Sequence, residues 1–138
     1  MAKHRKSRPK KIERIIAFRR ITAIIDHLST ERGLQAEEKV KRIFCKERKA
    51  TWPVWLYGVR KGYEEEDHHG IDFVARTDIG DIFIQIKSSE SGALNFKNHP
   101  KYNPLTALVV IKARDDEKVV STKVISTLSR KRMLMKNV

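Results

Sequence analysis

The clearest pattern of apolar and polar positions in the chain predicts a β-hairpin. Two short runs rich in Ile, Val and Phe cover residues 71–76 and 81–87, and residues 77–80 between them have the composition of a tight turn. In the second run three isoleucines alternate with phenylalanine, glutamine and lysine, so the isoleucines share one face of the strand. We expect that face to belong to the protein core.

The opposite face of this hairpin carries polar groups at one end. Gln85 and Lys87 share that face, and the partner strand carries Asp72. A carboxylate, an amide oxygen and an ammonium can therefore meet at one end of a small sheet. Such a grouping is unusual for packing, and it suits the binding of a metal ion and a phosphate.

Two amphipathic helices are predicted before the hairpin. Apolar residues recur at helical spacing over residues 11–28 and again over residues 31–47. At about 100° per residue, Glu37 lies at the edge of the apolar face of the second helix and Glu38 lies nearly opposite that face. Glu37 can thus face a cleft beside the core, whereas Glu38 is expected in solvent. An ordinary surface position is the alternative for both glutamates.

The remaining segments complete an α/β pattern. We expect, in chain order, a strand over 54–60, a solvated acidic loop over 64–67, a polar loop over 88–104 with a short helix near 93–99, a strand over 105–113, a short strand over 118–120 and a helix over 121–135. Trp52 and Trp55 suit core or interface packing more than base stacking. His69 is a further candidate, for proton transfer. These elements predict an α/β fold with a central mixed sheet flanked by helices and an extra N-terminal helix.

Charge changes this picture because it is concentrated at the two ends of the chain. The net charge of the 138 residues is +13: residues 1–20 carry +8, residues 121–138 carry +5, and the remainder is neutral overall. Basic ends around a neutral body favour a polyanionic partner, and we expect nucleic acid rather than an anionic membrane surface. Basic tails that only aid solubility are the alternative. We divide the chain into a basic tail and helix over 1–30 and a folded domain over 31–138.

Cysteine content and hydropathy bear on the cellular compartment. Cys45 is the only cysteine, so no internal disulfide can form and a reducing compartment is expected. Arginines interrupt the apolar stretch near the start, which argues against a secretory signal. The longest uncharged apolar run, residues 105–111, is too short to span a bilayer. We therefore expect a soluble, cytoplasmic protein without a membrane partner.

Three short motifs resemble those of the PD-(D/E)XK nuclease superfamily. They are Gly33 followed by Glu37 on the helix before the sheet, Gly70-Ile71-Asp72, and Gln85-Ile86-Lys87 with glutamine where glutamate is commoner. The resemblance covers residues 33–111 and is closest to the glutamine branch, as in Mrr-type restriction endonucleases; archaeal Holliday junction resolvases share the fold and the small size. In many Mrr-type proteins an acidic residue and a second glycine precede Gly-x-Asp. Here Asp67 is one residue out of step, and His69 replaces the glycine.

The resemblance implies a restriction-endonuclease-like core that hydrolyses phosphodiester bonds of DNA with Mg²⁺ or Mn²⁺. The implied metal ligands are Asp72, the Gln85 side-chain oxygen, the Ile86 carbonyl and Glu37. Lys87 would orient or activate the attacking water and stabilise the charge that develops on the phosphate. The implied catalytic set is Glu37, Asp72, Gln85 and Lys87. Because glutamine removes one negative charge, we expect weaker metal binding than in versions with glutamate.

DNA contacts are expected beside this site and on the last helix. The candidate residues are Ser88, Lys97, Lys101, Arg130, Lys131 and Arg132. A homodimer is expected as well, because cutting two strands needs two sites. Two other functions stay open. One is a non-catalytic nucleic-acid-binding module that kept the fold, and the other is a nucleoprotein subunit that binds RNA through its basic tails.

Overall fold

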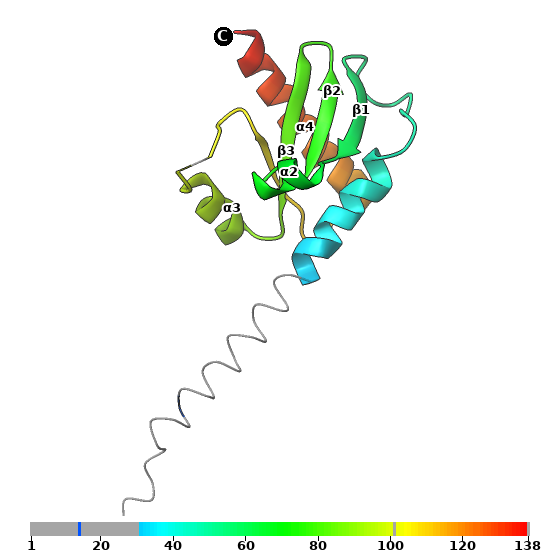
Figure 1. Cartoon of the computed structure of the whole chain (residues 1–138). Coiled ribbons are helices and arrows are strands. Elements are labelled where there is room, and N and C mark those ends of the chain that lie inside the picture. The colour runs from blue at the N-terminus through cyan, green and yellow to red at the C-terminus, as the bar shows by residue number, and fades with distance from the viewer. Residues whose placement is uncertain (1–13, 15–30, 101, 138) are drawn as a thin grey trace, which may run out of the picture. The chain divides into compact units, whose positions relative to one another are not determined.

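A four-stranded mixed sheet forms the centre of the protein (Figure 1). The computed structural model describes residue 14 and residues 31–100 and 102–137. The strands, whose spatial order is that of the chain, are β1 (Leu56–Lys61), β2 (Phe73–Thr77), β3 (Gly80–Lys87) and β4 (Ala107–Val110). β2 pairs antiparallel with β1 and with β3, and β4 pairs parallel with β3.

Helices flank this sheet, which confirms the predicted α/β class with a mixed sheet. One helix covers residues 31–44, and the others are α2 (Glu64–His68), α3 (Glu90–Lys97) and α4 (Glu117–Lys136). The predicted helix over 11–28 and the basic tail lie outside the described residues, apart from Arg14. In the described part of the chain, no helix is long and apolar enough to cross a membrane.

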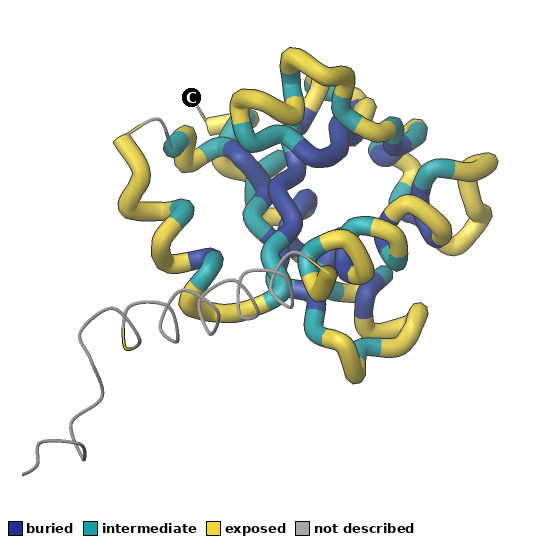
Figure 2. Tube along the Cα trace, turned by 60° about the horizontal axis from the view of Figure 1, so that its bottom comes forward, coloured by how far each residue is buried: buried dark blue, intermediate teal, exposed yellow. Residues whose placement is uncertain are grey.

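One face of the sheet packs against the 31–44 helix and α4. The three isoleucines of β3 are buried there, as their alternation predicts. Trp52 belongs to the same core and stacks on Phe44, with ring centroids 5.3 Å apart. Further large, fully buried side chains include Phe73, Leu56, Ile111 and Leu128. Figure 2 shows the buried stretches, in dark blue, gathered in the middle of the domain.

The hairpin of β2 and β3 forms as predicted. The Thr77 hydroxyl donates to the carbonyl of Gly80 (2.6 Å) and accepts from the amide of Ile79 (3.3 Å). Gly80 has φ +108°, a conformation that side chains with a Cβ rarely adopt. In the register of the two strands, Phe73 lies opposite Ile84. This register decides which polar residues meet at the far end of the hairpin.

The acidic segment before β2 is solvated, as expected, but it forms a short helix, α2, and not a loop. Glu66 accepts from the amide of Tyr63 (2.8 Å) and closes a capping box at the start of the helix. The same carboxylate forms a bidentate ion pair with Arg60 of β1, at 2.7 and 3.0 Å. The cap and the ion pair to the neighbouring strand together explain why so short a segment is helical.

Element ends differ from the prediction where tertiary contacts intervene. β2 begins at Phe73 instead of residue 71, because the amides of Gly70 and Ile71 donate to the carbonyls of Asp67 and Glu66 (3.0 and 2.9 Å). This pairing ties the chain to α2 before the strand starts. β1 starts two residues later than predicted, β4 is shorter, and the short helix expected after the hairpin is α3.

The last helix starts at Glu117, earlier than predicted, so the short strand expected over residues 118–120 is wrong. Asp116 caps the helix, because its side chain accepts from the amide of Val119 at 2.9 Å. The residues after the cap therefore begin α4 and bury Val120 in the core. The first described helix ends at residue 44, three residues before its predicted end.

Candidate metal centre

Three carboxylates from different elements meet at one end of the sheet. Glu37 comes from the 31–44 helix, Asp67 from α2 and Asp72 from the residue before β2, and one oxygen of each lies within 4.8 Å of the other two. Asp72 is buried, Glu37 is half-buried and Asp67 is exposed, so the group runs from the interior to solvent. This carboxylate cluster could hold a metal ion.

Asp72 is fixed in the cluster by the backbone of β3. Its amide donates to the carbonyl of Ile84 (2.9 Å), and its Oδ2 accepts from the amide of Ile86 (2.8 Å). Burial and a hydrogen bond with Glu37 raise the pKa of Asp72 to about 8, against the opposing effect of the Ile86 amide. Without a cation, the carboxyl group of Asp72 therefore keeps its proton near neutral pH. A divalent cation would take the place of that proton.

Gln85 adds a buried oxygen that lacks a partner. The residue is 6% exposed, and its Oε1 has no hydrogen-bond partner among the described residues. The backbone groups that hold Asp72 belong to Ile84 and Ile86, the residues on either side of Gln85. Leaving such an oxygen unpaired costs about 1–3 kcal/mol, which a bound cation would relieve. Carboxylate and amide oxygens fit Mg²⁺ or Mn²⁺, because both ions prefer oxygen ligands.

Gly70 allows the chain after α2 to pass close to this amide. The residue has φ +79°, and a Cβ built on it would lie 2.9 Å from the ring of Phe96 and 3.4 Å from the Oε1 of Gln85. Both the backbone conformation and the lack of space favour glycine here. The structure therefore explains why the Gly-Ile-Asp motif has glycine at position 70.

Lys87 lies on the same face of β3 as Gln85, but its ammonium is turned toward α3. The Nζ atom is 5.3 Å from the centroid of the Phe96 ring, a cation–π contact. Lys87 forms no ion pair with any described residue. Ile86 contacts the cluster through its amide. The structure thus gathers Glu37 and Asp72, sets Gln85 beside them, and directs Lys87 toward α3.

Lys61 of β1 is the cation paired with the cluster. Its Nζ lies 3.9 Å from the Oε2 of Glu37 and 5.2 Å from the centroid of the Phe73 ring. About half of the lysine side chain is exposed, and exposed pairs at such distances contribute little. Lys61 therefore balances only part of the negative charge of the carboxylate cluster.

Asp67 is the member of the cluster that the sequence analysis did not count among the metal ligands. An acidic run suggests a solvated loop, and a helix of five residues is too short to show a periodic pattern. The available signal was Tyr63-x-x-Glu66, which forms the capping box, followed by Gly70. Glu38 is exposed, as expected, and lies outside the cluster.

Three residues expected to contact DNA form a basic cluster, Lys97, Arg130 and Lys131. Burial and the nearby charges of Lys97 and Arg130 lower the pKa of Lys131, so the three side chains lie near one another on α3 and α4. The Nζ of Lys131 donates to the carbonyl of Pro104 at 2.7 Å. Lys97 and Arg130 are exposed, so a phosphate backbone can reach them.

Arg132, also expected to contact DNA, is engaged within the protein. It forms a bidentate ion pair with Asp78 in the hairpin turn (2.8 and 2.6 Å), and its guanidinium lies 5.2 Å from the centroid of a Trp55 ring. Its side chain is only 15% exposed. Arg132 therefore fastens α4 to the hairpin. Lys101 lies outside the described residues.

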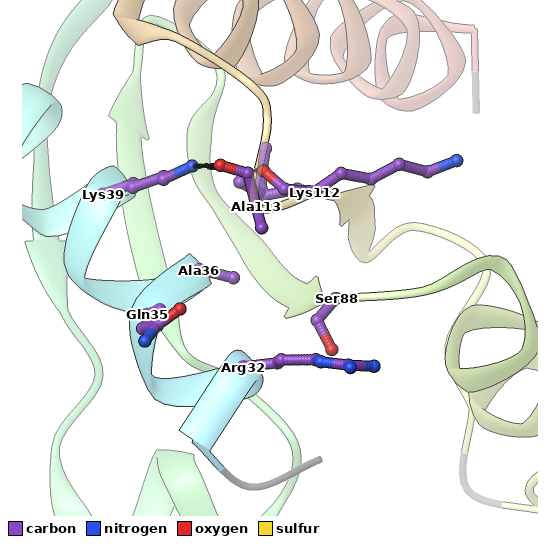
Figure 3. Close-up of a pocket in the computed structure, with 8 residues that line it drawn as sticks. Arg32, Gln35, Ala36, Lys39, Ser88, Lys112 and Ala113 are labelled. Atoms are coloured by element: carbon purple, nitrogen blue, oxygen red, sulfur yellow. Dashed lines mark hydrogen bonds between the residues drawn. The ribbon is translucent and has the colours of Figure 1, made fainter. Parts of the chain in front are cut away.

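Ser88 lines a small pocket directly after β3 (Figure 3). Arg32 and Lys112 flank this pocket, and Lys39 reaches its wall from the 31–44 helix. The Nζ of Lys39 is occupied, because it donates to three carbonyls of the loop after β4 (3.1, 2.7 and 3.0 Å). Lys112 pairs with Glu90 at 3.6 Å. Arg32, Gln35 and Ser88 remain as donors that line this pocket.

The candidate centre as a whole combines three carboxylates and an unpaired amide oxygen at one end of the sheet, with a lysine on the same face of β3 as the amide. A basic cluster lies on the neighbouring helices. Such a set can bind a divalent cation and a polyanion. In comparisons with known proteins, no family model, no curated protein and no solved structure matches this chain.

Proposed function

We propose that this protein is a metal-dependent DNA endonuclease with a restriction-endonuclease-like core and the glutamine variant of the PD-(D/E)XK site. One observation carries the proposal. Glu37 and Asp72, which are far apart in sequence, have carboxylate oxygens within 4.8 Å of each other. Asp72 is bonded to Ile84 and Ile86, the residues on either side of Gln85, whose buried oxygen is unpaired. Hydrophobic packing gives no reason for this arrangement, whereas a bound cation does.

Mg²⁺ or Mn²⁺ would supply an electrophile for a phosphate oxygen and a more acidic water. The side-chain oxygens of Glu37, Asp72 and Gln85 are the groups suited to hold the ion. Lys87 is on the same sheet face as Gln85, and its contact with Phe96 is a weak one that a phosphate or a water can replace. Its ammonium would then donate to the attacking water or to the phosphate oxygens.

DNA as the substrate is supported by charge. The excess charge of +13 lies in the two ends of the chain, and the C-terminal part contributes Arg130 and Lys131 to the basic cluster with Lys97. Arg32 and Ser88 add donors where β3 ends. Phosphate contacts of this kind position a duplex without reading its sequence. A homodimer and a cytoplasmic location belong to the same proposal.

A cleavage assay tests the proposal. The full chain is incubated with supercoiled plasmid, single-stranded DNA and a four-way junction, each with Mg²⁺, Mn²⁺ or a chelator. We expect cutting of at least one substrate that depends on the cation. Lys87→Ala should be folded by circular dichroism, should still bind DNA and should not cut it. Wild-type protein that leaves every DNA form intact with both cations would contradict the proposal.

A second candidate function is a DNA-binding module without catalysis. The observation that favours it is the orientation of Lys87, whose ammonium lies over the Phe96 ring and forms no ion pair with the described residues. In that case wild-type protein and Lys87→Ala would bind DNA equally well, and neither would cut it. The same assay therefore separates the two functions.

A further inference from the structure

We infer that Asp67 of α2 is a ligand of the divalent cation and restores the negative charge that the cluster lacks because residue 85 is glutamine. This inference rests on the proposed function, since it concerns the same site. It assigns a metal-binding task to a residue that lies outside the three motifs of the resemblance. Three features support it: the placement of Asp67, the unpaired Gln85 oxygen against the turn that follows Asp67, and the charge of the cluster.

The placement of Asp67 is fixed by the way α2 is anchored. Glu66, the preceding residue, is held by two bonds from Arg60 of β1 and by the amide of Tyr63. The carbonyl of Asp67 accepts from the amide of Gly70 at 3.0 Å. With the backbone tied on both sides, a carboxylate oxygen of Asp67 lies within 4.8 Å of those of Glu37 and Asp72.

The oxygen of Gln85 is the independent observation that points to a ligand. It is buried, it has no partner among the described residues, and it lies against Gly70, in the turn that connects Asp67 to Asp72. A buried amide oxygen without a donor is satisfied by a cation. Because carboxylate oxygens of Asp67 and Asp72 lie within 4.8 Å of each other, one cation can reach both.

The charge of the cluster explains why a third carboxylate is needed. In the motif with glutamate, residues 72 and 85 would supply two negative charges beside Glu37. Here residue 85 is neutral, and Asp67 brings the number of carboxylates back to three. Divalent-ion affinity depends strongly on how many charged ligands a site has. Compared with the glutamate form of the motif, the third carboxylate thus lies on α2 instead of β3.

An ordinary surface acid is the alternative for Asp67, and its neighbours on α2 show what that looks like. Glu64 is 92% exposed in its side chain and lies 4.0 Å from His68 of its own helix. Glu65 is exposed and belongs to no carboxylate cluster in the described residues. Glu65 therefore offers a matched control: the same helix, the same loss of charge and no place in the site.

The test measures Mn²⁺ affinity by isothermal titration calorimetry on the full chain, without DNA. The variants are Asp67→Asn, Gln85→Glu, the double variant Asp67→Asn/Gln85→Glu and the control Glu65→Gln. We expect Asp67→Asn to weaken Mn²⁺ binding about tenfold and Gln85→Glu to tighten it. The double variant should return to within about threefold of wild type, and Glu65→Gln should differ from wild type by less than about twofold. Thermal unfolding with chelator establishes that each variant is folded.

The outcomes separate this inference from the proposed function. If wild type binds Mn²⁺ and Asp67→Asn binds it equally well, Asp67 is not a ligand, while the proposed endonuclease stands. If the loss in Asp67→Asn is not recovered in the double variant, the exchange of charge between positions 67 and 85 is refuted. If neither wild type nor Gln85→Glu takes up Mn²⁺, the metal site itself fails and both proposals fall.

Discussion

Two groups of carboxylates among the described residues have opposite electrostatics. Asp78 and Glu66 each receive a bidentate arginine, and these contacts hold the pKa of Asp78 below its ordinary value and that of Glu66 at about 2. Asp72 instead lies buried beside Glu37, and its pKa rises to about 8. Arginines of the fold neutralise the paired acids, whereas the clustered acids crowd like charges together, which a proton or a cation would relieve.

This difference separates the acids that hold elements together from the acids of the candidate site. The arginine pairs each connect two elements: Arg132 of α4 to the hairpin turn, and Arg60 of β1 to α2. The cluster also brings together side chains from three elements, but its carboxylates repel one another. This repulsion lowers the stability of the folded state unless a proton or a cation neutralises part of the charge. Arrangements that weaken the fold are characteristic of functional sites.

The largest expected effect is on cleavage. Asp72→Asn should lower the rate of metal-dependent DNA cutting at least about thousandfold, because it removes the central ligand while its side-chain oxygen can still accept from the Ile86 amide. Asp78→Asn, in a paired acid, should change the rate by less than about twofold. Plasmid nicking in Mn²⁺ measures both. Equal losses in the two variants would erase the distinction between the groups.

The stability of the metal-free protein should fall as the pH rises from about 4 to about 8. The folded-state pKa of Asp72 lies above its unfolded value, so its contribution is complete at low pH and is lost as the group ionises in the folded protein. Each pH unit that separates the folded-state pKa from the unfolded one corresponds to about 1.4 kcal/mol of unfolding free energy. Urea unfolding with chelator at pH 5 and pH 8 measures the loss.

Asp72→Asn is the control for this pH dependence, because asparagine does not ionise. Its stability should change much less between pH 5 and pH 8, and at pH 8 it should exceed that of metal-free wild type. Adding Mn²⁺ at pH 8 should stabilise wild type and leave Asp72→Asn unchanged. A wild-type stability that rises over this interval would contradict the raised pKa.

Among the basic residues, the same contrast between paired and unpaired side chains predicts which ones bind DNA. Replacing Lys97, Arg130 and Lys131 together by glutamine should weaken duplex binding about tenfold at low salt and reduce the slope of log K against log salt by about 2.7. Arg132→Met should leave that slope unchanged, because its guanidinium already pairs with Asp78. Fluorescence anisotropy at several salt concentrations measures the slopes. If Arg132→Met reduced the salt slope more than the triple variant does, this assignment of the DNA-binding residues would be wrong.

The smallest expected effect is on thermal stability. Arg132→Met should lower Tm by about 2 °C at pH 7, since α4 loses its ion pair with the hairpin turn. The pKa of Asp78 is lowered in the folded state, so the contribution of the pair is present above the unfolded pKa and is lost as the pH falls through the folded one. The difference from wild type should therefore shrink below about pH 3. Arg130→Met, an exposed neighbour, is the matched control.

Local patterns predicted the parts of the molecule that local chemistry determines. The isoleucine face and the tight turn follow from an alternation and a turn sequence within residues 71–87, and the structure has both. The helical phase that put Glu37 at the edge of an apolar face agrees with its half-buried position in the cluster. Each of these features needs only neighbours along the chain.

Contacts between distant segments explain what the sequence could not reveal. α2 is helical partly because Arg60 of the preceding strand holds Glu66, and Asp67 enters the cluster only once that helix exists. Arg132 and Asp78 are 54 residues apart, so no local pattern indicates that this arginine is occupied. The direction of Lys87 depends in the same way on Phe96 of α3.

The turn at Gly70 fixes the number of residues that can separate Asp67 from Asp72. Asp67 and Asp72 belong to one short stretch, whose path is fixed by the amides of Gly70 and Ile71 and by the positive φ of the glycine. Inserting or deleting a single residue there would swing one acid away from the other, even if every side chain were kept. In an alignment of distant relatives, the number of residues between these two acids should therefore vary less than the lengths of the neighbouring segments.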